Sequence, residues 1–304
     1  QYKALKSVPG FEDVKFFRPG YAIEYDYFPP TQLKHSLETK PIKNLFFAGQ
    51  INGTTGYEEA AAQGLMAGIN AHLSINSKEA FVLNRDQAYI GVLIDDLITK
   101  GTEEPYRMFT SRAEFRMLLR QDNADIRLTH LSHSIGLASN DRLSLVNSKI
   151  NKTNKFIDFI TGLSVKPEEI NPILSYKNSK EISQSMKLRK LYSRPNILKD
   201  DISKLEAVLN YVTKNNIKDD VFEQAEIQIK YSGYIDKEKA NAEKLNNLEN
   251  IKVPEGFDYS KLKSLSSEAR VKLEEIKPKT LSQASRISGV SPADISAMLV
   301  FMGR

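Results

Sequence analysis

One short stretch constrains the fold of this chain more than any other: an apolar run that leads through three glycines into a helix. The apolar run covers 45–48, the glycines lie within 49–56, and a helical pattern extends over 57–73. A buried strand, a tight turn and a helix in succession are typical of α/β domains. We therefore predict a strand at 45–48 and a helix at 57–73, with Thr55 and Glu58 as a capping box.

The glycine loop at 49–56 permits two interpretations. Glycines let a ligand approach the backbone because they carry no Cβ, and the free N–H groups at a helix start attract phosphate. The same glycines also suit a purely structural strand-to-helix turn. The loop has neither the Gly-Lys-Ser/Thr of a Walker A motif nor the Gly-x-Gly-x-x-Gly fingerprint, so its spacing alone does not decide between a binding site and a turn.

The rest of the sequence indicates two regions of different character. Residues 1–50 carry Pro-Gly and Pro-Pro pairs between short aromatic runs, which is typical of strands and turns. After Ser77 helical periodicity dominates, with loops expected at Pro167, Pro172 and Pro195. The predicted helices are 79–100, 111–121, 141–162, 200–215, 219–230, 236–250, 267–276 and 280–302. We predict a mainly α chain, the end of an α/β domain followed by an all-helical region.

An arginine-rich segment follows the helix predicted at 79–100. Ser111 and Glu114 form a second capping box that is expected to open the helix at 111–121. Three arginines on that helix would form one stripe with a rise of about 6 Å between neighbours, which suits successive phosphates of a nucleic acid: Arg112, Arg116 and Arg120. Tyr106 and Phe109 offer rings for base stacking. The alternative is a solvated helix face paired with neighbouring carboxylates.

The formal net charge of +5 is unevenly distributed. Residues 1–170 hold 20 basic and 20 acidic side chains, so the whole excess lies in 171–304. The densest basic patch is at 187–194, and its cations are Lys187, Arg189, Lys190 and Arg194. This charge is compatible with a nucleic-acid partner, and equally with an ordinary solvated helix surface.

The end of the chain has the pattern of a helix–turn–helix. Gly289 falls in the turn, Ser291 is the expected N-cap, Pro292 is the first helical residue and Asp294 closes a capping box. The second helix starts with small and apolar residues instead of the Arg, Lys, Asn or Gln that read bases. We therefore favour a packed helix pair or a protein-partner surface over DNA reading.

No catalytic constellation can be assigned from the residues themselves. The chain has no cysteine, which removes disulfides, cysteine-zinc sites and a thiol nucleophile from within it. His130 and His133 lack a third ligand nearby, so no metal site is expected. No apolar run approaches the ~20 residues that a bilayer requires, which argues against an integral membrane protein.

Three stretches of the chain resemble the signatures of one family. The residues 46–64 read Phe-Phe-Ala-Gly-Gln-Ile-Asn-Gly-Thr-Thr-Gly-Tyr-Glu-Glu-Ala-Ala-Ala-Gln-Gly, and 104–114 read Glu-Pro-Tyr-Arg-Met-Phe-Thr-Ser-Arg-Ala-Glu. The third stretch, 283–290, reads Gln-Ala-Ser-Arg-Ile-Ser-Gly-Val. The chain is similar to the tRNA uridine 5-carboxymethylaminomethyl modification enzymes, the glucose-inhibited division protein A family. The resemblance covers nearly the whole chain, but only the C-terminal half of the family's protein.

The resemblance implies a cytoplasmic, homodimeric flavoprotein that binds FAD and uses NADH. With a GTPase partner and a folate-borne one-carbon unit, it would install an aminomethyl or carboxymethylaminomethyl group on carbon 5 of the wobble uridine of certain tRNAs. The residues implied to contact FAD are Gly49, Gln50, Asn52, Gly53, Thr54, Thr55, Gly56 and Tyr57. Those implied to lie on the tRNA path are Arg107, Arg112, Arg116, Arg120, Lys187, Arg189 and Lys190. No catalytic residue follows from it.

The resemblance also suggests how the chain is organised. Residues 1–78 would be the C-terminal part of a Rossmann-like FAD-binding domain, 79–220 a helical domain, and 221–304 a helical subdomain for tRNA and the GTPase. The family's Gly-x-Gly-x-x-Gly, its NADH-binding insertion and its cysteines lie outside this chain, which also has no initiator Met. We therefore expect a piece of a longer protein that alone neither holds FAD tightly nor catalyses the reaction.

Two alternatives to this assignment stay open. One is a helical RNA- or protein-binding module whose glycine loop is only structural. The other is the shorter folate-dependent tRNA uridine methyltransferase relative, which lacks the long helical region after residue 78.

Overall fold

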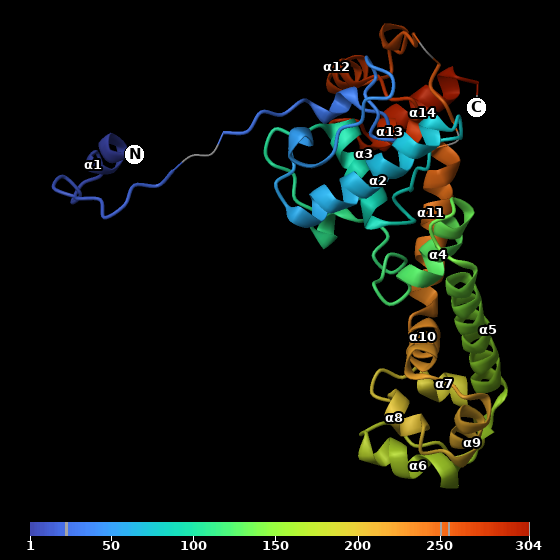
Figure 1. Cartoon of the computed structure of the whole chain (residues 1–304). Helices are drawn as coiled ribbons and strands as arrows, with labels where there is room; N and C mark the ends of the chain where they lie inside the picture. Colours follow the sequence, from blue (N-terminus) through green and yellow to red (C-terminus); the bar gives the residue numbers. More distant parts are fainter. Residues whose placement is uncertain (22–23, 250, 255, 304) are drawn as a thin grey trace. The chain divides into compact units, whose positions relative to one another are not determined.

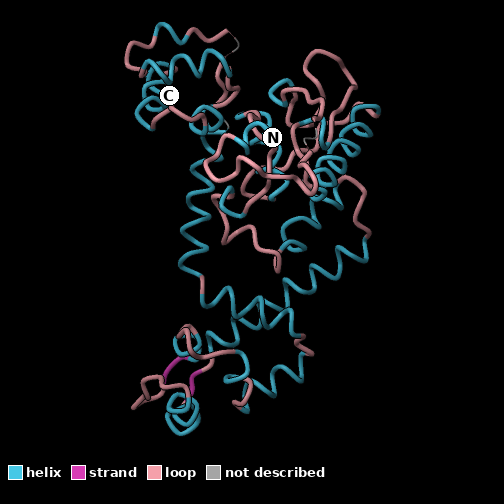
Figure 2. The backbone as a smooth tube through the Cα atoms, turned by 90° about the vertical axis from the view of Figure 1, so that its left-hand side faces the viewer, coloured by secondary structure: helices cyan, strands magenta, loops and turns pink. Residues whose placement is uncertain are grey.

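The computed structural model describes residues 1–21, 24–249, 251–254 and 256–303. Helices make up most of this part of the chain, and the strands in it are short (Figure 2). The mainly helical fold that the sequence predicts is therefore confirmed. Among the described residues, no helix combines the length and the hydropathy that crossing a membrane requires.

The chain divides into two compact units. The first comprises Gln1–Phe81 and Gly101–Arg107, and the second comprises Val82–Lys100 and Met108–Arg304. The polypeptide therefore passes between the units three times. The domain boundaries predicted after residues 78 and 220 stay predictions.

One long helix, α2 (Tyr57–Ile75), organises the first unit and confirms the helix predicted at 57–73. Its buried side chains follow a helical period and include polar as well as apolar groups: Glu59, Gln63, Met66, Ala67, Asn70 and Leu73. The other elements of this unit are α1 (Tyr2–Lys6), η1 (Pro30–Gln32) and η2 (Gly49–Asn52).

The strand predicted at 45–48 is wrong. Phe46 forms only an isolated bridge with Glu38, and the N–H of Phe47 donates to the carbonyl of Leu37 at 3.1 Å. The apolar run thus pairs with a tight turn instead of with a second strand. A turn of that length cannot supply the ladder of hydrogen bonds that defines a strand.

The strands expected elsewhere in 1–50 are likewise absent from the described residues of that range. They reduce to one further isolated bridge, between Leu33 and Thr39. The aromatic run that follows Tyr21 includes residues 22 and 23, which lie outside the described residues.

The helix predicted at 79–100 begins only at Tyr89, as α3 (Tyr89–Lys100) in the second unit. In the first unit, the side chain of Asn70 accepts from the N–H of Phe81 at 2.7 Å and donates to the carbonyl of Phe81 at 2.9 Å. Backbone groups that are already bonded to a side chain are not available to a helix. The start of the predicted helix is therefore not helical: 79–84 has no regular secondary structure and 85–87 forms a turn.

The second unit contains the remaining helices. They are η3 (Thr110–Arg112), α4 (Ala124–Ser134), α5 (Asn140–Gly162), α6 (Pro167–Tyr176), α7 (Leu188–Tyr192), α8 (Lys199–Ile202), α9 (Glu206–Asn215), α10 (Asp219–Lys230), α11 (Ser232–Glu249), η4 (Tyr259–Lys261), α12 (Ser267–Ile276), α13 (Leu281–Arg286) and α14 (Pro292–Phe301). Strands β1 (Ser164–Val165) and β2 (Met186–Lys187) pair antiparallel, with Ser164 opposite Lys187. The helices predicted at 141–162, 219–230 and 267–276 are confirmed to within one residue at each end.

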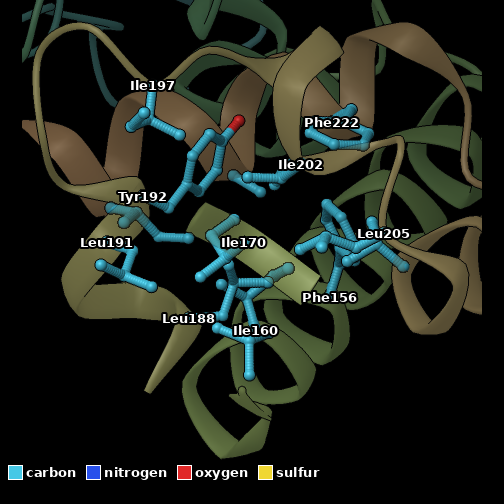
Figure 3. Packing of buried hydrophobic residues seen from close by; sticks show 14 of the residues in the cluster. Phe156, Ile160, Ile170, Leu188, Leu191, Tyr192, Ile197, Ile202, Leu205 and Phe222 are labelled. Atoms are coloured by element: carbon cyan, nitrogen blue, oxygen red, sulfur yellow. The ribbon is translucent and has the colours of Figure 1, made fainter. Parts of the chain in front are cut away.

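A large apolar core forms where α10 packs along α5 (Figure 1). Side chains from α5 to α10 converge there and point toward one another (Figure 3), among them Phe156, Ile160, Ile170, Leu188, Leu191, Tyr192, Ile197, Ile202, Leu205 and Phe222. On α5 these apolar residues recur at helical spacing, which is why the sequence predicts this helix well.

The loops predicted at Pro167 and Pro172 are wrong, because both prolines lie in α6. Pro167 is the first helical residue, where an N–H group has no partner to lose. Pro172 removes one hydrogen bond within the helix, and the burial of Ile170 and Leu174 on the same helix offsets that loss. The helix predicted at 200–215 is interrupted after Ile202 and resumes as α9.

A second core joins α12, α13 and α14, with Leu273, Leu281 and Met298 fully buried. The helix pair expected at the chain end is confirmed. Ser291 caps α14 and accepts from the N–H of Asp294 at 3.2 Å. Gly289 has a φ of 90°, a left-handed conformation that favours glycine in this turn.

Candidate functional site

The glycine loop at 49–56 has a defined conformation. It starts as η2 and turns at Gly53, whose φ of 77° lies in the left-handed region. The carbonyl of Ile51 accepts from the N–H of Phe28 at 2.8 Å, and the carbonyl of Gly53 accepts from the N–H of Tyr106 at 2.8 Å. Segments from both parts of the first unit therefore hold the loop.

The side chain of Gln63, in the second turn of α2, is the central support of the loop. Its Oε1 accepts from the N–H of Gly49 at 3.1 Å and from Nδ2 of Asn52 at 2.8 Å. Its Nε2 donates to Oγ1 of Thr54 at 2.9 Å and to the carbonyl of Glu59 at 3.2 Å. Gln63 is fully buried, so these bonds form away from water. We did not single out Gln63 from the sequence, although it stands within the stretch 46–64.

The residues implied to contact FAD fall into an inner and an outer group. Asn52 and Thr54 are fully buried. Nδ2 of Asn52 also donates to the carbonyl of Phe47 at 3.0 Å, and Oγ1 of Thr54 donates to the carbonyl of Gly49 at 2.8 Å. Three side chains of the same set are exposed instead: Gln50, Thr55 and Tyr57. The inner group shapes the loop, and the outer group is available to a ligand.

The capping box predicted for Thr55 and Glu58 is wrong, because the N-cap of α2 is Gly56. A Cβ at Gly56 would lie 1.7 Å from Oε2 of Glu59 and 2.4 Å from Nη1 of Arg107. A Cβ at Gly53 would lie 2.5 Å from Oγ1 of Thr102. The left-handed φ of Gly53 and its contact with Thr102 favour glycine there, whereas the Cβ clash at Gly56 involves the ends of two flexible side chains that could move.

The helix predicted at 111–121 is wrong as well, and the arginine stripe built on it disappears. Only the short turn η3 (Thr110–Arg112) forms there. Glu114 does not cap a helix but binds Nη2 of Arg85 at 2.7 Å. The N–H groups of Met117 and Leu118 both donate to Oε2 of Glu238, at 2.9 and 3.2 Å. Partners distant in sequence therefore determine the path of this segment.

Arg85 is the buried centre of these contacts, and we did not anticipate it from the sequence. Its Nη1 lies 3.0 Å from Asp95 and 2.7 Å from Asp96, and Arg286 of α13 reaches Asp95 at 2.8 Å. Burial by itself lowers the pKa of Arg85, but Asp96, Glu114 and Asp95 outweigh burial and raise that pKa above its ordinary value. The guanidinium therefore stays charged.

The three arginines of the predicted stripe have different environments. Nε of Arg120 pairs with Asp122 at 3.1 Å. Arg112 has its carbonyl bound to Nη2 of Arg85 at 3.2 Å. Arg116 is exposed, and its guanidinium has no hydrogen-bond or ion-pair partner among the described residues.

The other cations implied to bind tRNA have mixed roles. Arg107 lies 3.9 Å from Glu58 and 3.7 Å from Glu59 at the start of α2. Nζ of Lys187 donates to the carbonyl of Gly162 at 2.6 Å, and Arg189 donates to Oγ1 of Thr161 at 3.2 Å. Lys187 therefore caps a carbonyl at the C-terminal end of α5, and Arg189 adds a second positive charge there, where positive charge is favourable. Lys190 beside them is exposed.

Comparison with known proteins matches three parts of the chain to one family. Residues 1–79 match the family described as Glucose inhibited division protein A. Residues 140–239 match the tRNA modifying enzyme MnmG/GidA C-terminal helical domain, and residues 241–304 match the C-terminal helical bundle of the same enzyme.

The chain is 66% identical over 304 residues to the tRNA uridine 5-carboxymethylaminomethyl modification enzyme MnmG of Flavobacterium psychrophilum, and 57% identical over 303 residues to that of Karelsulcia muelleri. These alignments cover 100% and 99% of this chain, but 49% and 48% of the enzymes.

Among solved structures, Aquifex aeolicus GidA is similar with a TM-score of 0.75 and 44% identity, over 100% of this chain and 47% of that one. The chain thus spans about half the length of the curated relatives it matches. Since its whole length aligns with these enzymes and their family matches follow one another along it, the chain belongs to the MnmG/GidA family.

Proposed function

We propose that this chain is part of an enzyme that modifies carbon 5 of the wobble uridine in certain tRNAs, installing an aminomethyl or carboxymethylaminomethyl group. The observation that carries the proposal is the high identity along the entire chain to enzymes named for that reaction. The alignment with these enzymes includes 46–64, which contains the glycine loop, and 104–114, which begins the arginine-rich segment.

The residues of loop 49–56 fit an FAD site in the complete enzyme. The outer side chains of Gln50, Thr55 and Tyr57 would contact the cofactor, and the N-terminus of α2 would favour its diphosphate. In the same loop, the buried Oδ1 of Asn52 has no hydrogen-bond partner among the described residues. This oxygen could accept a hydrogen bond from a ligand. When bound, FAD would supply redox chemistry, with NADH as the reductant.

The tRNA would contact cations of the second unit, and we propose Arg112, Arg116, Arg120, Lys187, Arg189 and Lys190 for this role, with Arg107 beside the loop. The C-terminal helix pair would face the GTPase partner. The complete enzyme would work as a homodimer with a folate-borne one-carbon unit. Of the proposed tRNA contacts, Arg116 and Lys190 carry this proposal best, because their charged groups face solvent.

The test compares the full-length protein with this chain alone. The full-length protein should purify with flavin and restore the modified uridine, read by nucleoside mass spectrometry, in a strain that lacks its own enzyme. Gln50→Ala and Tyr57→Ala should lower flavin occupancy, while the flavin-free variants keep the thermal midpoint of the flavin-free wild type. The isolated chain should hold no flavin, and near one equivalent of flavin absorbance in it would refute that part of the proposal.

One observation favours a second candidate, a helical RNA- or protein-binding module with a structural glycine loop. The left-handed conformation of Gly53 and its contact with Thr102 already favour glycine, so no ligand is needed to explain that position. A full-length protein that binds tRNA but never contains flavin would establish this candidate over the first.

A further inference from the structure

The loop that carries Arg116 is fixed onto α11. Oε2 of Glu238 receives the N–H groups of Met117 and Leu118, at 2.9 and 3.2 Å. One carboxylate therefore anchors the two residues that directly follow Arg116. The backbone at Arg116 is therefore held close to the start of α11, while the guanidinium of Arg116 is exposed.

Two exposed tyrosines, one directly before α11 and one in its first turn, share a helix face with Glu238. Tyr234 is 67% exposed and Tyr231 is 45% exposed. The N–H of Ile235 donates to the carbonyl of Tyr231 at 2.9 Å, so 231–235 is one helical turn. Residues three, four and seven positions apart share a helix face, which places Tyr231 and Tyr234 in line with Glu238.

The charges around this face favour an anionic ligand. Glu238 is occupied by two backbone N–H groups, and Lys237 is exposed three residues after Tyr234. Asp236 is two residues from Tyr234, and at about 100° per residue it points away from this face. Arg116 has no carboxylate partner among the described residues, whereas Arg120 is paired with Asp122.

We propose that Tyr231, Tyr234 and Arg116 form a surface that binds unpaired nucleotides of RNA. The tyrosine rings would stack on bases, and Arg116, assisted by Lys237, would contact the phosphates between them. Aromatic rings beside a cation on a fixed backbone are the parts from which single-stranded nucleic-acid sites are built. This inference rests on the proposed function, because it gives the tRNA a specific place of contact.

The experiment measures tRNA binding by the full-length protein at several salt concentrations. Tyr234→Ala should weaken binding roughly 5- to 100-fold with an unchanged salt dependence, because base stacking releases no counterions. Arg116→Ala should also weaken binding, and it should lower the slope of log K against log salt by about 0.7. The matched control is Tyr176→Ala, which removes a tyrosine that is 79% exposed elsewhere in the second unit.

Equal thermal midpoints of the variants would show that each is folded, and Tyr234→Phe should bind like the wild type because it keeps the ring. If the wild type binds tRNA and Tyr234→Ala binds as tightly as Tyr176→Ala, the inference fails while the proposed function stands. Binding of unstructured oligouridine but not of tRNA, lost in Tyr234→Ala, would support the surface and refute the proposed function. If the full-length protein binds neither tRNA nor oligouridine, both this inference and the proposed function are wrong.

Discussion

The two motifs that dominate the sequence, the glycine loop at 49–56 and the arginine segment that follows residue 105, are held in place by opposite means. A neutral amide, Gln63, fixes the first through hydrogen bonds. A buried charge, Arg85, joins the second to α3: it binds Glu114 and the carbonyl of Arg112 in the segment, and Asp95 and Asp96 in α3. In both motifs the central support is a buried residue outside the motif's exposed positions. The comparison teaches that many polar residues of a signature are structural, and that their exposed neighbours are the ones available for binding.

The largest test of this comparison is Arg85→Met. It leaves Asp95 and Asp96 buried with one fewer cation, and breaking a buried ion pair in this way costs about 3–5 kcal/mol in free energy of unfolding. Urea unfolding of the full-length protein measures the loss. The control is Lys100→Met, which removes a half-exposed cation 2.8 Å from Asp96 and should cost at most about 1 kcal/mol. Equal effects of the two variants would contradict the central role of Arg85.

Gln63→Leu probes the neutral support and should cost less. It leaves the N–H of Gly49 buried without its acceptor and frees one polar end of Asn52 and of Thr54, a loss of about 1–3 kcal/mol. Hydrogen exchange at Gly49 and Gly53 should accelerate, while the amides of α5 and α10 keep their protection. The exposed residue Gln50 provides the control, since Gln50→Leu should leave that exchange unchanged. Unaltered exchange in Gln63→Leu would show that the loop does not depend on the amide.

Acid should weaken the arginine segment before it weakens the amide-held loop. Although burial raises the pKa of Asp122, hydrogen bonds from Gln224 and Arg120 outweigh it and hold that pKa below its ordinary value. Its contribution to stability is therefore complete above the ordinary pKa of about 3.9 and is lost as the pH falls through the lower pKa of the folded state. Asp122→Asn should flatten this part of the profile of unfolding free energy against pH. If the variant and the wild type show the same profile, Asp122 does not contribute to the loss of stability in acid.

The smallest effects should come from the exposed members of each motif. Gln50→Ala and Arg116→Ala remove side chains that support neither structure, so in the flavin-free full-length protein each should change the free energy of unfolding by less than about 0.5 kcal/mol. Thermal denaturation checks this. If either variant lowers the free energy of unfolding by more than about 1 kcal/mol, its exposed side chain does support the structure, and the comparison is wrong at that residue.

Local sequence information predicts those elements that depend on their own apolar periodicity or on their own capping side chain. The helices at 57–75, 140–162 and 219–230 are of this kind, and so is the capped turn at Ser291. Periodicity and capping residues act within one element, so reading them requires no knowledge of the rest of the fold.

The failures lie where partners far apart in sequence take over the backbone. Glu238 binds the N–H groups that a helix at 111–121 would have used, and it is more than 100 residues away. The strand at 45–48 lacked a pairing partner, which no property of its own residues reveals. In the candidate site, too, the part that depends on residues farther along the chain was not predicted. The loop itself was found, but the inward direction of Asn52 and Thr54 depends on Gln63 of α2.

The short segment Gly101–Arg107 has a practical consequence for dissecting this protein. It returns to the first unit after α3 and brings Thr102 against Gly53, Tyr106 into a hydrogen bond with Gly53, and Arg107 to the start of α2. Covalent order and spatial order therefore differ, so truncation after residue 78 would deprive the loop of one wall. A truncation that preserves the loop must carry α3 as well or splice 101–107 back through a linker.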